Sequence, residues 1–154
     1  ESIKDIRKII YNLRPMSIDD LGFVPALERY IEKFASDTEI EVDFAILSKV
    51  NLEDKIRSVS IFRIIQEVLN NIRKHAHATF VKIEIEMKEK NIYVNIVDNG
   101  IGFNTEDIKP NDNEEGGFGL INIRERAELL NGDVEIISEI NKGTTMIVNI
   151  PIED

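Results

Sequence analysis

Apolar residues recur along this chain at two spacings, and each spacing predicts a type of element. A helical spacing of three or four residues runs from Ile3 to Leu13, where Pro15 ends it, and again from about Phe23 to Ala35. The first of these helices is too short to be stable alone in water, so we expect it to pack against a partner helix.

The longest helical pattern is predicted to begin at an N-cap, Asn51, and to end at about Ala76. Its apolar stripe faces the core and consists of Ile61, Ile64, Ile65, Val68 and Ile72. Beside that stripe, within roughly another 100° of arc, the helix places four polar groups together: Glu67, Asn71, Lys74 and His75. Asn70 lies nearly opposite the core stripe.

Alternation of apolar and polar residues predicts strands at residues 39–47, 79–88 and 91–98, and two further strands are expected at residues 134–140 and 144–151. The second and third form a hairpin around Lys88–Asn91, and the last two form another. A further helix at residues 120–130 is closed by Asn131 and Gly132. This order of elements predicts an α+β fold in two layers, with one mixed, mostly antiparallel sheet covered on one face by helices.

Length and charge narrow the class of protein. The 154 residues suit one domain, or one domain with a short appendage. A formal net charge of -10 argues against a nucleic-acid binder, which needs a basic face. The sequence has no cysteine, no signal peptide and no apolar run near the ~20 residues that span a bilayer. Because it opens at Glu1 within a helical pattern, we interpret it as part of a longer protein.

The stretch from Asp98 to Gly102 has two possible readings. Asn99-Gly100 is a strong hairpin signal, but alternation does not resume after it. Alternatively, Asp98 is a half-buried carboxylate that accepts a hydrogen bond from an exocyclic amine, while Gly100 and Gly102 let a ligand approach the backbone. From these residues alone, both readings stay open.

Two other polar segments are candidates for phosphate and metal binding. In the long helix, carboxylate and amide oxygens suit Mg²⁺ and Lys74 suits phosphate, although a solvated flank with a Glu67–Lys74 ion pair fits equally. After a long acidic loop, Gly116, Gly117 and Gly119 either expose backbone N–H groups to an anion at the start of a helix or form a flexible hinge. Neither a dinucleotide-binding fingerprint nor a Walker A loop is present. His75 and His77 lack an adjacent acid, so we expect neither to be a nucleophile.

Taken together and in this order, these segments resemble the boxes of the GHKL ATPase superfamily, whose fold is the Bergerat α/β sandwich. "QEVLNNIRKHAHAT" resembles the N box, "DNGIGF" the G1 box, "GGFGL" the G2 box and "GTTMIVNIP" the closing strand. Within the superfamily, the chain is similar to the ATP-binding catalytic domain of bacterial sensor histidine kinases. Residues 1–21 resemble the end of the dimerisation and histidine-phosphotransfer domain in the DegS-like class, which partners NarL-type response regulators. The resemblance thus implies a catalytic domain at residues 22–154.

The resemblance implies a role for each matching residue. It assigns Mg²⁺ binding to Asn71, catalysis to Glu67, a phosphate contact to Lys74 and a position beside the nucleotide sugar to His75. It assigns adenine recognition to Asp98, with Gly100 and Gly102 shaping the pocket and the Thr144 hydroxyl assisting. Gly117 and Gly119, followed by Leu120, correspond to the loop that folds over the phosphates.

The implied function is a two-component histidine kinase module that binds ATP and Mg²⁺. It would transfer the γ-phosphoryl to a histidine on the dimerisation domain, for relay to an Asp of a response regulator. No histidine followed by an acid precedes the catalytic segment, so we expect this chain not to phosphorylate itself. The implied parent is a homodimer, and we expect a cytoplasmic location without direct membrane contact or nucleic-acid binding. The alternatives are an anti-sigma-type serine kinase and a nucleotide-free interaction module of the same fold.

Overall fold

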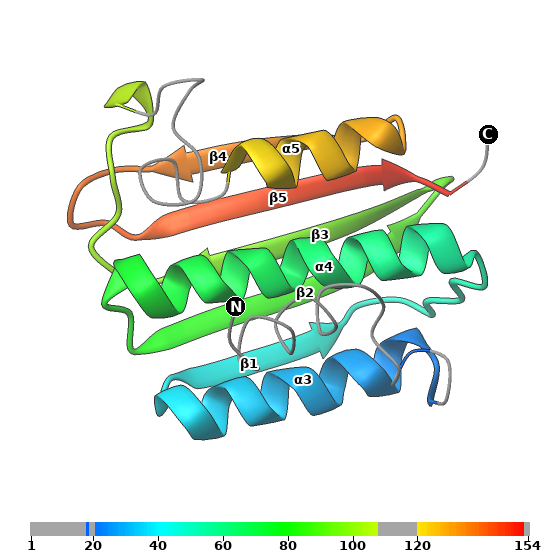
Figure 1. The fold of residues 1–154 in the computed structure, drawn as a ribbon, viewed down its shortest axis with the longest axis horizontal. Coiled ribbons are helices and arrows are strands. Elements are labelled where there is room, and N and C mark those ends of the chain that lie inside the picture. Colours follow the sequence, from blue (N-terminus) through cyan, green and yellow to red (C-terminus); the bar gives the residue numbers. More distant parts are fainter. Residues whose placement is uncertain (1–17, 19–20, 108–119, 153–154) are drawn as a thin grey trace, which may run out of the picture.

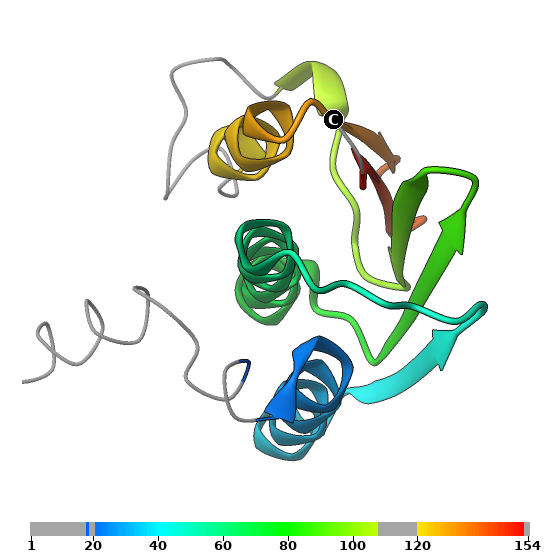
Figure 2. The same cartoon turned by 90° about the vertical axis from the view of Figure 1, so that its right-hand side faces the viewer.

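The computed structural model describes residue 18 and residues 21–107 and 120–152. Among these residues, a five-stranded sheet of order β1-β2-β3-β5-β4 forms one layer, and three helices form the other. Figure 2 shows the helices on one face of the sheet, with no described element on the opposite face. The strands are β1 (Glu41–Ile46), β2 (Phe80–Lys88), β3 (Asn91–Asp98), β4 (Asp133–Ser138) and β5 (Thr144–Pro151). The helices are α3 (Phe23–Thr38), α4 (Lys55–Asn71) and α5 (Leu120–Leu129), with a π turn η1 (Ile72–Ala76) and a 3-10 turn η2 (Thr105–Asp107).

The sheet is mixed because of how its strands are connected. β1 and β2 are parallel, as strands joined through the α4 crossover must be, whereas every other pair is antiparallel. α4 lies across the middle of the sheet, between α3 and α5 (Figure 1). The predicted α+β fold, with a mostly antiparallel sheet covered on one face, is confirmed.

The core lies between the two layers and follows the predicted patterns. All five residues of the predicted apolar stripe, four in α4 and Ile72 at the start of η1, are at most 4% exposed. They pack against the inward-facing residues of the central strands, such as Ile83, Val94 and Val148, each of which is 0% exposed. Fully burying one such side chain contributes roughly 1.5–3 kcal/mol, so this interface accounts for much of the stability of the fold.

The start of α4 differs from the prediction. Asp54, not Asn51, is the N-cap, and its carboxylate accepts from the backbone N–H groups of Ile56 at 2.9 Å and Arg57 at 3.2 Å. Asn51 lies outside the helix, and its own N–H points to the Met87 sulfur at 3.2 Å. Both residue types are good caps, but only the residue immediately before the first turn can reach the N–H groups of that turn.

The other helix ends lie close to their expected positions. α3 continues to Thr38, past the expected end at Ala35, and is closed by Glu39, which has φ 61° and donates its N–H to the Ala35 carbonyl at 2.9 Å. Asn131 closes α5 with φ 61°, as predicted for its Asn-Gly end. No helix within the described ranges is long and apolar enough to span a membrane.

The expected helix at Ile3–Leu13 lies outside the described residues, so the boundary between residues 1–21 and 22–154 stays a prediction. Ile18 is described, and it is 6% exposed within the core. The Gly22 N–H donates to its carbonyl at 2.9 Å. At least this residue of the preceding segment therefore packs into the core of the fold.

Candidate functional site

One pocket lies between the end of α4 and the strand ends of the sheet, toward the left of Figure 1. Its walls come from α4 and η1, from β3 and the loop after it, from the first residue of α5, and from β5. The lining residues are Val68, Asn71, Ile72, His75, Ala76, Ile96, Asp98, Ile101, Gly102, Phe103, Leu120, Thr144 and Met146. Most of these walls are apolar, so the few polar groups decide what the pocket binds.

Asp98 is the carboxylate within this mainly apolar pocket. It ends β3 and is 7% exposed. Burial raises the pKa of its carboxyl above the usual 3.8, while hydrogen bonds from the backbone N–H groups of Gly100 and Thr144 oppose the rise. The Gly100 N–H lies 2.8 Å from its Oδ1. Such a group is an acceptor suited to a planar ligand with an amine edge, since a mismatched ligand would leave it without a partner.

The two glycines after Asp98 are required by close backbone contacts. A Cβ at Gly100 would lie 2.2 Å from the Ala76 carbonyl oxygen, at the end of η1. A Cβ at Gly102, which has φ +64°, would lie 2.0 Å from the Glu139 carbonyl oxygen. The Ile101 N–H donates to the Ala76 carbonyl at 2.7 Å, so this segment is joined to the helix end. The hairpin interpretation is therefore wrong, because the chain after Asn99 packs against η1 and the β4–β5 turn, and residues 100–107 form no strand.

Asn99 itself is structural. Its Oδ1 accepts from the backbone N–H groups of Thr79 at 2.9 Å and Phe80 at 3.0 Å, and its Nδ2 donates to the Thr79 hydroxyl at 2.9 Å. These bonds connect the end of β3 to the start of β2. The Asn side chain thus holds the loop that carries Asp98 and the glycines.

Thr144 lines the pocket, and its hydroxyl is held by Ser138, a residue that the sequence analysis missed. Thr144 pairs with Asp98 on one side and with Ser138 on the other. The hydroxyls of Ser138 and Thr144 lie 2.8 Å apart, and Ser138 Oγ also accepts from the Phe103 N–H at 2.9 Å. Only the register of three strands brings Ser138 here, and a lone serine at a strand end gives no sequence signal for it.

The four polar residues predicted to group on the long helix separate into three positions. Asn71 and His75 line the pocket, whereas Glu67, one turn earlier, lines a different cavity on the outer side of α4. Lys74 is exposed and lines neither cavity. The π turn, which often occurs at functional sites, carries His75 toward the pocket.

The two histidines differ in environment. Burial and then the nearby Lys74 charge lower the pKa of His75, so its imidazole is neutral at physiological pH and can accept or donate one hydrogen bond. His77 is exposed and occupies the C-cap of η1 with φ 51°. The expectation that neither histidine is a nucleophile stays a prediction.

Two expected site residues, Gly117 and Gly119, lie outside the described residues, as do Glu114 and Glu115 of the acidic loop. Leu120 is described, and it lines the pocket as the first residue of α5.

The sequence analysis missed the apolar walls of the pocket, above all Phe103 and Met146. The only sequence signal for Phe103 is that it follows Gly102, and the only one for Met146 is that it lies near the start of the final strand.

Comparisons with known proteins agree with this geometry. Residues 56–154 match the family model described as Histidine kinase-, DNA gyrase B-, and HSP90-like ATPase. The chain is 41% identical to the signal transduction histidine-protein kinase/phosphatase DegS of Brevibacillus brevis, over 98% of this chain and 38% of DegS. It is 37% identical to the oxygen sensor histidine kinase NreB of Staphylococcus carnosus, over 99% of this chain and 43% of NreB. It therefore spans only about two fifths of the length of these relatives.

Solved structures support the same fold. The histidine kinase AdeS of Acinetobacter baumannii aligns with a TM-score of 0.69 at 16% identity, covering 99% of this chain and 81% of that chain. At this identity the likeness concerns the fold alone. The sheet and the helical layer that covers it therefore form a known architecture.

Proposed function

Because this chain belongs to the histidine kinase-, DNA gyrase B- and HSP90-like ATPase family, we propose that it is the ATP-binding kinase module of a sensor histidine kinase. The observation that carries the proposal is the buried Asp98 carboxylate inside an apolar pocket, one wall of which presents Asn71. Adenine fits this chemistry, since its faces are apolar and its exocyclic amine is a donor. Asp98 accepts from that amine, and Thr144 assists through its own hydroxyl, which is hydrogen-bonded to the Ser138 hydroxyl.

The phosphates extend from this pocket along the end of α4, where Lys74 and His75 follow Asn71. Gly117 and Gly119 are proposed to contact the phosphates from the other side. Within the described ranges no group of three His, Cys, Asp or Glu residues can hold a metal. Asn71 fits as a single protein ligand of Mg²⁺, an ion that commonly keeps waters and substrate phosphates as its remaining ligands. The bound ion neutralises charge on the transferring phosphoryl group.

Glu67 is proposed to act on the attacking group. It precedes Asn71 by one helical turn, so their Cβ atoms lie about 5–6 Å apart. The carboxylate can accept a proton from, or orient, a histidine nucleophile that arrives from outside the nucleotide pocket. Positioning and charge neutralisation account for most of the catalysis in such phosphoryl transfer.

The acceptor is proposed to be a histidine on a dimerisation domain of the same protein, acting within a homodimer. The phosphoryl group then passes to an Asp of a NarL-type response regulator. The names of the two relatives support a histidine kinase of this class. A cytoplasmic location follows from the proposal, because ATP is the substrate.

Phosphotransfer in trans tests this function. The chain is incubated with Mg²⁺, ATP labelled at the γ-phosphate and a separately purified histidine-bearing helical domain from a kinase of this family. We expect acid-labile, alkali-stable label on the acceptor. The Glu67→Gln variant should transfer roughly 10²–10⁴-fold more slowly with unchanged nucleotide affinity, as for loss of a general base. Acid-stable label on serine would contradict the proposal and favour the serine-kinase alternative.

A further inference from the structure

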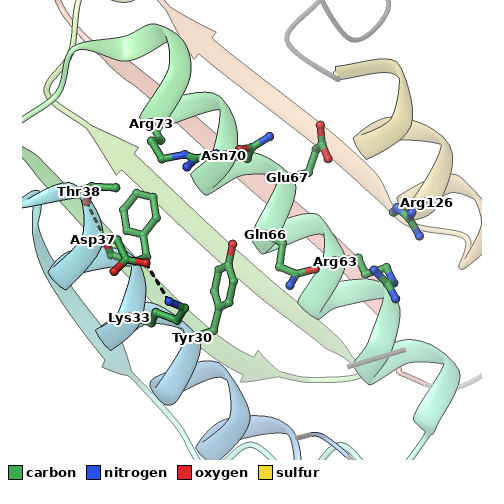
Figure 3. Close-up of a pocket in the computed structure, with 11 residues that line it drawn as sticks. Tyr30, Lys33, Asp37, Thr38, Arg63, Gln66, Glu67, Asn70, Arg73 and Arg126 are labelled. Atoms are coloured by element: carbon green, nitrogen blue, oxygen red, sulfur yellow. Dashed lines mark hydrogen bonds and ion pairs between the residues drawn. The ribbon is translucent and has the colours of Figure 1, made fainter. Parts of the chain in front are cut away.

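A second cavity, of about 330 Å³, lies over the outer face of α4, the face turned away from the sheet. Figure 3 shows that its sides come from α3 and from Arg126 of α5, with α4 as the floor. We call it the α4 trough. At roughly 30 Å³ per water, it has room for several side chains of a partner.

The α4 trough is rich in cations although the chain as a whole is acidic. Its lining includes Lys33, Arg63, Arg73 and Arg126 but only two carboxylates, Asp37 and Glu67. Lys33 and Asp37 pair at 3.1 Å, and the other charged residues of the lining are three arginines and Glu67. In a chain of net charge -10, this local excess of positive charge favours an acidic ligand.

The arginines are spread along the α4 trough at fixed positions. Arg63 is 6% exposed in the floor, while Arg73 is exposed and held by a bond from its Nη2 to Asn70 Oδ1 at 2.9 Å. Ten residues of helix separate these two, which corresponds to about 15 Å. Arg126 projects from α5 at the Arg63 end of the α4 trough (Figure 3); it is exposed and makes no hydrogen bond or ion pair to any other described residue. A ligand that meets all three must therefore be extended along α4.

The α4 trough also adjoins the proposed reaction site. Glu67 belongs to the α4 trough and Asn71, one turn later, belongs to the nucleotide pocket. On the proposed function, on which this inference rests, the acceptor histidine must reach Glu67 from outside that pocket. The α4 trough is the cavity from which it can do so.

We propose that the α4 trough docks an acidic helical segment, the one that presents the acceptor histidine, and that Arg73 and Arg126 bind its carboxylates. A helix lying parallel to α4 would place carboxylates two to three turns apart opposite the arginines. Arginine suits this task because its planar fork binds carboxylates bidentately. Arg73 and Arg126 are positioning residues, since they orient the segment and do not touch the reacting atoms.

Charge reversal tests the proposal in the phosphotransfer assay described above. We expect Arg126→Glu and Arg73→Glu each to raise the KM for the acceptor domain at least tenfold, with kcat and nucleotide affinity within twofold of the wild type. Lys82→Glu is the matched control, because the exposed Lys82 alternates with the buried Val81 and Ile83 and so lies on the open face of the sheet. Replacing the acceptor carboxylates by lysine should restore a low KM in Arg126→Glu. An unchanged KM in both arginine variants, or an equal rise in the control, would overturn the proposal.

A direct binding arm separates this inference from the proposed function. The chain is titrated into a labelled helical peptide with glutamates two to three turns apart, and into its glutamine counterpart. We expect only the glutamate peptide to bind, with at least tenfold weaker binding in Arg126→Glu and in raised salt. Equal binding of the two peptides, or none, would refute the α4 trough as an acidic-segment site. Nucleotide titration of the same preparation reports independently on the proposed function.

Discussion

Replacing Gly102 by alanine tests whether the pocket loop is built on backbone contact. Two costs add at this position. Alanine at φ +64° is strained by about 1–2 kcal/mol. Its Cβ would also lie 2.0 Å from the Glu139 carbonyl oxygen and 2.9 Å from the Gly143 carbonyl oxygen, and such overpacking costs about 1–3 kcal/mol. The sum, about 2–5 kcal/mol, is a large part of the 5–15 kcal/mol typical of a domain.

Two other glycines separate these costs. Gly22 has φ +88° with nothing within 4 Å of the added Cβ, so Gly22→Ala shows strain alone. Gly100 meets the Ala76 carbonyl oxygen at 2.2 Å without a positive φ, so Gly100→Ala shows contact alone. Urea unfolding with a constant m-value gives each loss in the free energy of unfolding. We expect Gly102→Ala to lose more than either control. A loss no larger than that of Gly22→Ala would refute the reasoning.

Three further predictions concern single side chains. Asp54→Ala should lower the free energy of unfolding by about 1 kcal/mol in urea at pH 7, and Asn51→Ala by less than about 0.5 kcal/mol. Since the Arg57 hydrogen bonds lower the pKa of Asp54, the difference should be present above pH 3.8 and disappear as pH falls through the lowered pKa. Ser138→Ala should cost about 1–3 kcal/mol, measured the same way, because the partly buried Phe103 N–H loses its acceptor. Burial raises the pKa of Asp98, so the contribution of its carboxyl to stability is greatest below pH 3.8 and declines as the pH rises through the raised pKa. In a pH series of urea melts, Asp98→Asn should abolish that decline. The variant should therefore be more stable than the wild type at pH 7.

The layers of this fold could be predicted from the sequence because its binary pattern coincides with burial. Ile61, Ile64 and Ile65 follow the helical period, and the residues of β3 alternate along its whole length. The N-cap could not be chosen with certainty, since "NLED" offers both Asn51 and Asp54. Only the position of the first helical turn decides between them.

The site was predictable in its residue types but not in its grouping. A helical wheel places Glu67 beside Asn71, but it does not show that separate cavities lie on either side of them. That separation depends on α3 and α5 packing against α4. Ser138 meets Thr144 only because β4 and β5 pair in one register, and pairing between strands is a long-range property.

Calorimetric titration with a non-hydrolysable ATP analogue tests the central claim, that Asp98 lies in an adenine pocket. The wild-type chain should bind saturably and more tightly with Mg²⁺. Asp98→Asn should bind at least tenfold more weakly, as expected when about 1–3 kcal/mol is lost at a mismatched buried polar group. Wild-type affinity should also fall as the pH is lowered through the raised pKa of Asp98. Equal affinity of the two proteins, or no binding of the wild type at millimolar analogue, would contradict the account.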